Sequence, residues 1–431
     1  MRAISRRSML IAGFSTVVEW YDFTLYIYVA TILSRVVFGG GKGSLAVVLA
    51  GFAVAYLMRP LGALAMGHYG DRHGRRRAML LSMAVMTAAM LGCAVLPTYA
   101  QIGPAAGMML LALRCVMAFA VGGEYTGVVA YLLEGARPER RGLITSCASA
   151  ASEVGALLAV GVAALTAWAL PPDALDAWGW RIPFFVGAVL AGGVLLARAA
   201  MDESPEYERQ RAAGTVPKAP LRHAVKHQRA GIARGFAISA LGSISYYVGI
   251  TYVPAFLASV GAVGEGAAGE SSALGLSTVA AFVVIAVTPL VGALSDRVGR
   301  RPVLIGVAAA CAAGPITLFA LMASGGVWPA LVGAVLLACL GGAVSAVGAV
   351  ATAEQFSGEA RLSGLALGVT SATAVFGGLT PLAAQMLLEA TGWPGVPGAM
   401  IAVVALAILP VLWRIPETAP RAGWTAQPQP I

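Results

Sequence analysis

Long apolar runs recur along the whole chain, and they constrain the fold more than any other feature. Twelve runs of about 18 to 30 residues are each long enough to cross a hydrocarbon core roughly 30 Å thick. A backbone in lipid has to satisfy its own hydrogen bonds, which runs of this length do as helices. The sequence therefore predicts an all-α integral membrane protein with twelve transmembrane helices. The runs lie at about 9–38, 45–66, 78–96, 102–124, 143–170, 182–201, 231–260, 272–294, 303–322, 327–350, 362–388 and 393–413.

Lysine and arginine residues gather in alternate loops between these runs. They precede the first run, follow the second, fourth, sixth, eighth and tenth, and recur at the end of the chain. Basic loops stay on the cytoplasmic side of a membrane. We therefore expect a multi-pass protein of a bacterial inner membrane with both termini in the cytoplasm. The net charge of +9 reports this topology and does not indicate a nucleic-acid partner.

One loop motif occurs twice, each time after the second run of a set of six. "GHYGDRHGRR" begins at Gly67 and "GALSDRVGRR" begins at Gly292, with the Gly, Asp, Arg, Gly and Arg-Arg positions matched at one offset. A weaker echo pairs "EGARPERRG" from Glu134 with "EQFSGEARLSG" from Glu354. The repetition predicts two six-helix bundles related by a pseudo-twofold axis in parallel repeat.

Composition sets the expected domain boundaries. The N-terminal bundle is predicted over 1–202 and the C-terminal bundle over 231–431. Residues 203–230 between them are polar, basic and contain prolines. We interpret this stretch as a cytoplasmic linker that acts as a hinge and not as a folded domain.

The duplicated loop resembles the signature of the major facilitator superfamily, and the resemblance covers the whole chain. The segments "EWYDFTLY", "RPLGALAMGHYGDRHGRR", "FAVGGEYTG", "GWRIPFF" and "ESPEYE" resemble the metabolite:proton symporter family, whose members carry citrate, 2-oxoglutarate, shikimate, proline or betaine. The resemblance implies the major facilitator fold and a carrier that is not an enzyme. It also implies a monomer driven by the proton gradient, whose partners are a small solute, protons and the bilayer, with no cofactor and no metal.

The repeated loop also predicts a cytoplasmic gate. Its glycines allow close approach of helices, and Asp71 can accept hydrogen bonds from amides at a neighbouring helix N-terminus. Its arginines can pair with acids on adjacent loops, of which Glu134 is the first candidate. The family resemblance implies that this network closes the cytoplasmic side in the outward-facing state. The gate residues are Gly67, Asp71, Arg72, Gly74, Arg75, Arg76 and Glu134, with Asp296, Arg297, Arg300 and Arg301 in the second half.

Ionisable residues inside the apolar runs are costly in lipid and are therefore functional candidates. Glu19 and Asp22 lie roughly 15 and 20 Å into the first run, and Tyr26 shares their helix face. Four acids against two arginines, Arg59 and Arg114, leave two negative charges if all are ionised, while desolvation favours the neutral carboxyl form. Static ion pairs between helices remain the alternative. The candidates for proton coupling are Glu19, Asp22, Glu124 and Glu153.

The second half carries few charges inside its runs, so its contribution is expected to be hydroxyl, aromatic and amide contacts to a solute. Arg59 and Arg114 can hold a solute carboxylate as a fork, although structural pairing of both arginines is equally open. The candidates for substrate binding are Tyr26, Arg59, Arg114, Tyr246, Tyr247, Thr370 and Gln385.

These features together predict a proton-coupled secondary transporter that moves a small organic acid, such as a di- or tricarboxylate, by alternating access. Two alternatives stay open: uptake of a proline-like or betaine-like zwitterion, and export of a carboxylate-rich metabolite or chelator. A membrane enzyme or a receptor fits poorly, because no histidine lies in any run and no signalling domain is present. The chain also lacks the Gly-x-x-x-x-Gly-Lys loop of an ATP-driven pump.

Overall fold

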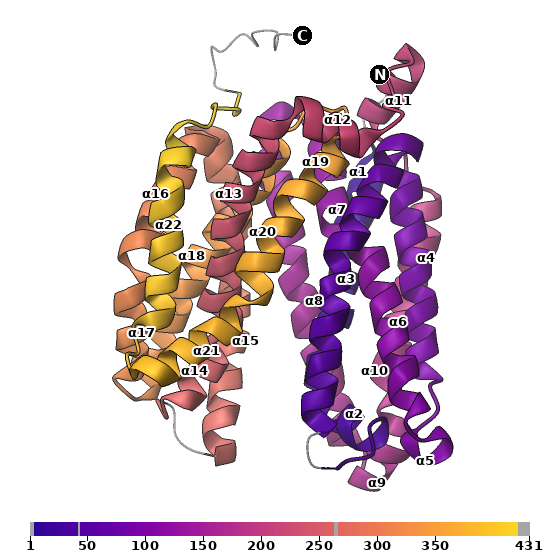
Figure 1. The fold of residues 1–431 in the computed structure, drawn as a ribbon, viewed down its shortest axis with the longest axis vertical. Coiled ribbons are helices and arrows are strands. Elements are labelled where there is room, and N and C mark those ends of the chain that lie inside the picture. The colour runs from indigo at the N-terminus through magenta and orange to yellow at the C-terminus, as the bar shows by residue number, and fades with distance from the viewer. Residues whose placement is uncertain (1–3, 42–43, 263–265, 421–431) are drawn as a thin grey trace. The chain divides into compact units, whose positions relative to one another are not determined.

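The computed structural model describes residues 4–41, 44–262 and 266–420, which form helices joined by short loops (Figure 1). Within these ranges there is no strand. Each of the twelve apolar runs is helical, either as one helix or as a helix interrupted by a turn. The all-α fold predicted from the runs is therefore confirmed.

Nine helices in the described part of the chain are long and apolar enough to cross a membrane. A tenth span results if α16 (Arg300–Ala313) and α17 (Pro315–Ala323) count as one helix, bent by 41°. The bend falls at Pro315, which cannot donate a backbone hydrogen bond. The two remaining runs depart from a simple apolar span, because the first carries two carboxylates and the seventh is divided by a π-helical turn.

Contacts divide the helices into two units, and each unit holds a short segment from the other half of the sequence. Unit 1 consists of Met1–Gly135, Ala151–Gln228 and Ser357–Thr370. Unit 2 consists of Ala136–Ala150, Arg229–Phe356 and Ser371–Ile431. The predicted division into two bundles and a linker stays a prediction.

Unit 1 contains the helices of the first half of the sequence and a segment of the eleventh run. Its long helices are α1 (Arg6–Tyr28), α3 (Ser44–His73), α4 (Arg75–Ala94), α6 (Ala105–Val121), α7 (Glu124–Gly135), α8 (Arg141–Ala169, whose first residues belong to unit 2) and α10 (Arg181–Ala199). Its short elements are α2 (Ala30–Val36), α5 (Tyr99–Ile102), α9 (Pro172–Ala174), η2 (Leu175–Gly179), α11 (Pro205–Ala213), α12 (Pro220–His227), α19 (Arg361–Leu365) and η4 (Ala366–Thr370).

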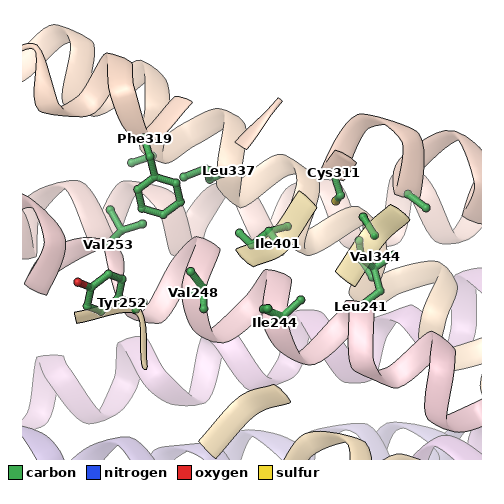
Figure 2. Close-up of a cluster of buried hydrophobic side chains, with 14 of the residues drawn as sticks. Leu241, Ile244, Val248, Tyr252, Val253, Cys311, Phe319, Leu337, Val344 and Ile401 are labelled. Carbon is green, nitrogen blue, oxygen red and sulfur yellow. The ribbon is translucent and has the colours of Figure 1, made fainter. Parts of the chain in front are cut away.

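Unit 2 contains the rest of the second half and a segment of the fifth run. Its elements are η1 (Pro138–Arg140), α13 (Arg229–Tyr246), η3 (Tyr247–Thr251), α14 (Val253–Ser259), α15 (Gly266–Val298), α16, α17, α18 (Val327–Ala353), α20 (Ser371–Thr373), η5 (Ala374–Gly378), α21 (Thr380–Thr391) and α22 (Val396–Trp413). Its core lies between α13, α17, α18 and α22, where Leu241, Ile244 and Val248 form one helical stripe (Figure 2).

Both copies of the repeated loop make the same sharp turn between two helices. α3 passes into α4 through Gly74, whose φ is +107°, and α15 passes into α16 through Gly299, whose φ is +119°. Residues with side chains rarely adopt such angles, so glycine is required at both positions. The duplicated motif therefore encodes a duplicated backbone shape.

The linker between the sequence halves is folded over much of its length. Ser204 caps α11 by accepting a hydrogen bond from the amide of Tyr207 at 3.2 Å, and Gly214 ends the helix with a φ of +68°. The hydroxyl of Tyr207 in turn donates to the carbonyl of Arg72 at 3.1 Å. Capping and tertiary contacts hold polar residues in α11, and α12 follows it, so the stretch contains two short helices, while its role as a hinge between the halves stays a prediction.

Candidate functional site

One face of α1 carries four polar side chains, all of them buried. Ser15, Glu19, Asp22 and Tyr26 follow one another at intervals of three or four residues, which places them on one face of the helix. Their partners belong to α3, α6, α7 and α10. We call these four residues the α1 seam, around which three buried ion pairs of unit 1 lie.

Glu19 forms an ion pair with Arg59 of α3, which lies beside α1 in the same unit. The guanidinium carbon of Arg59 lies 5.1 Å from the ring centre of Phe23 and 5.8 Å from that of Tyr56, which adds cation–π attraction. The second carboxylate oxygen of Glu19, Oε2, is buried and accepts no hydrogen bond from any residue that the structure describes. This oxygen is therefore open to a proton or to a donor group of a solute.

Asp22 forms the second ion pair of the seam, with Arg114 of α6. Nη1 of Arg114 donates to both carboxylate oxygens, at 2.9 and 2.8 Å. The same guanidinium lies 4.7 Å from the ring centre of Tyr26, whose hydroxyl donates to the carbonyl of Val48 at 3.1 Å. The hydroxyl of Tyr26 is thus engaged with backbone, and its ring supports Arg114.

The two ion pairs open on one pocket, whose lining comes from α1, α3, α4 and α6 of unit 1. The rings of Phe23, Phe52 and Tyr56 contact one another and form an aromatic wall beside Arg59. The rest of the lining is apolar: Ala55, Met86, Met117, Ala118 and Val121. Apolar walls with a few placed charges are typical of sites for small solutes.

A third ion pair, Glu124 with Arg198, contacts Ser15, which lies one helical turn from Glu19 on the α1 seam. Arg198 of α10 has 0% of its surface exposed and donates to Glu124 and to Ser15. The hydroxyl of Ser82, on α4, donates to the other carboxylate oxygen of Glu124. Three donors from three helices therefore hold this carboxylate.

Arg198 is the functional candidate that the sequence reasoning missed. It lies at the end of the sixth apolar run, where a basic residue is already explained by the excess of positive charge at the cytoplasmic ends of membrane helices. Arg198 adds a third buried cation to the two arginines of the sequence-based charge count, and it pairs with Glu124. Glu153 is also buried, on α8, but it does not line the pocket.

The second-half candidates do not line this pocket. Tyr246 and Tyr247 meet edge to face, with ring centres 5.5 Å apart, where α13 gives way to the π-helical turn η3. Gln385 accepts a hydrogen bond from the hydroxyl of Tyr252 at 2.6 Å. Thr370 ends η4, which belongs to unit 1. Tyr247 and Thr370 lie in π-helical turns, which are frequent at functional sites, and the role of all four positions in substrate binding stays a prediction.

The first copy of the repeated loop forms a buried ionic cluster with the second-half segment of unit 1. Asp71 accepts from the amides of Leu362 and Ser363 at 3.2 and 2.8 Å, at the start of α19. Arg75 lies 3.1 Å from Asp71 and 3.6 Å from Glu134. The cluster is completed by Arg361, which pairs with Glu134 at 2.6 Å, and by the close contact of Gly67 with the carbonyl of Leu362. We call this cluster latch 1.

The second copy forms the matching cluster in unit 2, which we call latch 2. Asp296 accepts from the amides of Gly142 and Leu143 at 2.8 and 2.9 Å, at the start of α8. Arg300 pairs with Asp296 at 2.8 Å and with Glu354 at 3.2 Å. Glu354 therefore occupies the role of Glu134, a correspondence that the weaker sequence echo already indicates.

The other gate arginines take peripheral positions. Arg72, Arg297 and Arg301 have exposed side chains, while the backbone amides of Arg76 and Arg301 donate to Glu203 and Glu417. Burial raises the pKa of Glu203, and the amide hydrogen bonds that it accepts oppose that rise. Over the described ranges, no three His, Cys, Asp or Glu side chains come together in a way that could hold a metal ion.

Family models match both halves of the chain. A model described as "Sugar (and other) transporter" matches residues 8–215, and one described as "Major Facilitator Superfamily" matches residues 266–430. Among curated proteins, the chain is 32% identical to the ectoine/proline transporter ProP of Corynebacterium glutamicum, over 91% of this chain and 81% of that protein. It is 33% identical to the alpha-ketoglutarate permease of Escherichia coli, over 86% and 85% of the two chains.

Further matches extend the comparison to another solute and to a solved structure. The chain is 32% identical to a citrate-proton symporter of Salmonella typhi, over 90% of this chain and 88% of that protein. Among solved structures, the proton:xylose symporter XylE bound to 6-bromo-6-deoxy-D-glucose superposes with a TM-score of 0.80 at 19% identity, covering 96% of each chain. At that identity the likeness concerns the fold alone.

Proposed function

Because the chain belongs to the metabolite:proton symporter family of the major facilitator superfamily and is a multi-pass membrane transporter, we propose that it couples the movement of a small organic acid to protons. The observation that carries the proposal is the Glu19–Arg59 pair at the pocket of unit 1. We place both termini on the cytoplasmic side of a bacterial inner membrane, as the basic loops indicate. The terminal residues themselves, 1–3 and 421–431, lie outside the described residues.

Competition for Arg59 supplies a mechanism of coupling. While Glu19 is ionised, it satisfies the guanidinium of Arg59. A proton on Glu19 removes that charge and leaves Arg59 to bind the carboxylate of a solute, as its planar fork favours. The solute carboxylate replaces the Glu19 carboxylate at the same cation, so the proton and the solute load together and neither leaves a buried charge unpaired.

A zwitterionic solute is the second candidate, and the aromatic wall favours it. Phe23 and Tyr56 already face a guanidinium group, which shows that the wall tolerates a cation. Aromatic rings of this kind also accept alkylated ammonium groups. The name of the ectoine/proline relative is in keeping with such a solute.

The test uses purified protein in liposomes that contain a pH-sensitive dye, with citrate, 2-oxoglutarate, shikimate, proline and betaine added in turn. We expect one solute to acidify the lumen, and Glu19→Gln to abolish both this acidification and uptake driven by a proton gradient. Glu139→Gln, at an exposed acid of η1, is the matched control and should behave as the wild type. Gradient-driven uptake that survives Glu19→Gln would contradict the proposed role of Glu19.

The same assay separates the two solute classes. Acidification by citrate or 2-oxoglutarate alone supports the organic acid, and acidification by proline or betaine alone supports the zwitterion. If none of the five acts on the wild type, proton-coupled uptake of these compounds is ruled out, and the export hypothesis is tested instead with larger carboxylate ligands.

A further inference from the structure

A second cavity in unit 1 lies between the Glu124 ion pair and latch 1. Its lining includes Ser82, Glu124, Thr126 and Gly127 together with Arg75. It has room for a water molecule and polar groups to bind one. Arg75 and Glu124 are its charged lining residues, so it connects an acid of the membrane interior with the buried arginine of the latch.

The hydrogen bonds of Glu124 give its two oxygens different roles. Arg198 and Ser15 donate to Oε1, and Arg198 is itself fixed by the carbonyl of Met79. Oε2 accepts from Ser82, whose hydroxyl is part of the cavity lining. One oxygen is thus anchored to the helices, while the other meets the cavity through a hydroxyl that both donates and accepts.

The α1 seam connects Glu19 with the hydrogen bonds of Glu124. Ser15, which contacts Glu124, precedes Glu19 by four residues, which is one turn of α1. Glu19 is therefore one helical turn from the serine that contacts the Glu124 carboxylate, and the cavity lined by Glu124 is also lined by Arg75 and Gly67 of latch 1.

We propose that Glu124, Ser82 and this cavity form the inner part of the proton path, an inference that rests on the proposed proton coupling. A proton leaves the carboxyl of Glu19 and binds the carboxylate of Glu124. It then leaves Glu124 through the hydroxyl of Ser82, which passes on its own proton to water in the cavity and accepts the proton from Glu124. The proton is released beyond Arg75. Arg198 and Ser82 are positioning residues, because they orient the carboxylate that carries the proton.

Gly127 offers a way to fill the cavity without disturbing the fold. It is buried, lies inside α7, and a Cβ at this position would meet no atom within 4 Å. Gly127→Ala therefore places a methyl group in the space that a water molecule would use, and alanine is the better helix former. Gly161 of α8 also has open space around its Cβ position but is exposed, which makes Gly161→Ala the matched control.

The experiment compares two modes of transport in liposomes for whichever solute acidifies the lumen. Counterflow of labelled against unlabelled solute needs no release of the proton, whereas net uptake with lumen acidification needs one release per cycle. We expect Gly127→Ala and Ser82→Ala to slow acidification by about tenfold or more while counterflow continues, and Ser82→Thr to restore it. Gly161→Ala should leave both rates unchanged.

The possible outcomes distinguish a failure of the proton path from a failure of the proposed proton coupling. Acidification at the wild-type rate in Gly127→Ala and Ser82→Ala overturns the path while leaving the coupling itself intact. Loss of counterflow together with acidification also overturns it, since the cavity would then serve the movement of the helices and not the proton. Absence of acidification in the wild type with every one of the five solutes rules out the proton-coupled uptake on which the path depends, and the path falls with it.

Discussion

At the scale of single residues, unit 1 keeps its buried charges in pairs. Glu19, Asp22 and Glu124 each meet an arginine from another helix. A buried ion pair adds little net stability, but removal of one partner leaves an uncompensated charge in a medium of low dielectric constant. The pairs therefore constrain which single substitutions the protein tolerates, and they fix how the helices that carry them are rotated.

The loss of stability on removing one partner of a buried ion pair can be measured at Asp22 and Arg114. We expect Arg114→Met to lower the free energy of unfolding by about 3–5 kcal/mol, because Asp22 is then buried without its cation. The double variant Asp22→Asn/Arg114→Met should recover most of that loss. Thermal unfolding in detergent, followed by tryptophan fluorescence, gives the comparison. Equal melting temperatures for the single and double variants would show that the two side chains are not coupled.

At the scale of elements, small residues let helices meet backbone to backbone in the latches. A Cβ on Gly292 of α15 would lie 2.6 Å from the carbonyl oxygen of Gly142 on α8, and a Cβ on Gly67 of α3 would lie 3.0 Å from the carbonyl oxygen of Leu362. These two glycines open the two copies of the repeated loop. Close helix packing through glycine thus explains the first position of the motif.

Gly292 can be tested against a glycine that makes no such contact. Gly292→Val forces a side chain into the α8–α15 interface and should destabilise the protein by about 1–3 kcal/mol, as overpacking of a filled interface does. Gly306 of α16 is exposed and has no atom within 4 Å of its Cβ position, so Gly306→Val is the control. If the melting temperatures of both variants fall equally, the loss of stability is caused by helix propensity alone and not by the interface.

The elements also show what the sequence can and cannot predict. Glu19, Asp22, Arg59 and Arg114 were identified because charge stands out in an apolar run. Their pairing was not predictable, since it depends on how α1, α3 and α6 are rotated about their axes. Arg198 was missed because a basic residue at the end of a run has a second, topological explanation, and only burial distinguishes the two.

The helices of the linker were not predicted for a related reason. Hydrophobic periodicity is the main sequence signal of a helix, and α11 has no periodic apolar stripe because charged and amide residues fill its middle. Its N-cap at Ser204 and its terminal glycine, Gly214, were the available local signals. The duplicated loop, by contrast, carries strong local signals. Its glycines and aspartates dictate backbone geometry directly, and the same turn appears twice.

At the scale of the whole molecule, each latch ties a segment of one sequence half to helices of the other. Asp71 holds the amides of Leu362 and Ser363 in unit 1, and Asp296 holds those of Gly142 and Leu143 in unit 2. Alternating access, which the sequence predicts, requires these segments to separate from their partners. Both latches must then break in every cycle.

The latches can be probed by the exposure of a residue that latch 1 buries. Ser363 has 0% of its surface exposed, so a thiol introduced by Ser363→Cys, in a background without the five native cysteines, should react slowly with a water-soluble maleimide. Adding Asp71→Asn removes charged hydrogen bonds worth about 1.5–3 kcal/mol and should raise the labelling rate tenfold or more.

The control for this labelling is Asp173→Asn, at an exposed acid of α9 that lies outside the latches. It should leave the rate at Ser363→Cys unchanged. An unchanged rate in Asp71→Asn as well would mean that Asp71 does not govern the opening of latch 1.

The three ion pairs at the α1 seam have an electrical consequence. Their three carboxylates and three guanidinium groups sum to no net charge, so one bound proton gives these pairs one positive charge. A full elementary charge crossing a membrane gains or loses about 2.3 kcal/mol per 100 mV. In the proposed coupling the carboxylate of a solute cancels the charge of the proton, so the transmembrane voltage acts neither on the empty pairs nor on the pairs loaded with a proton and one solute carboxylate.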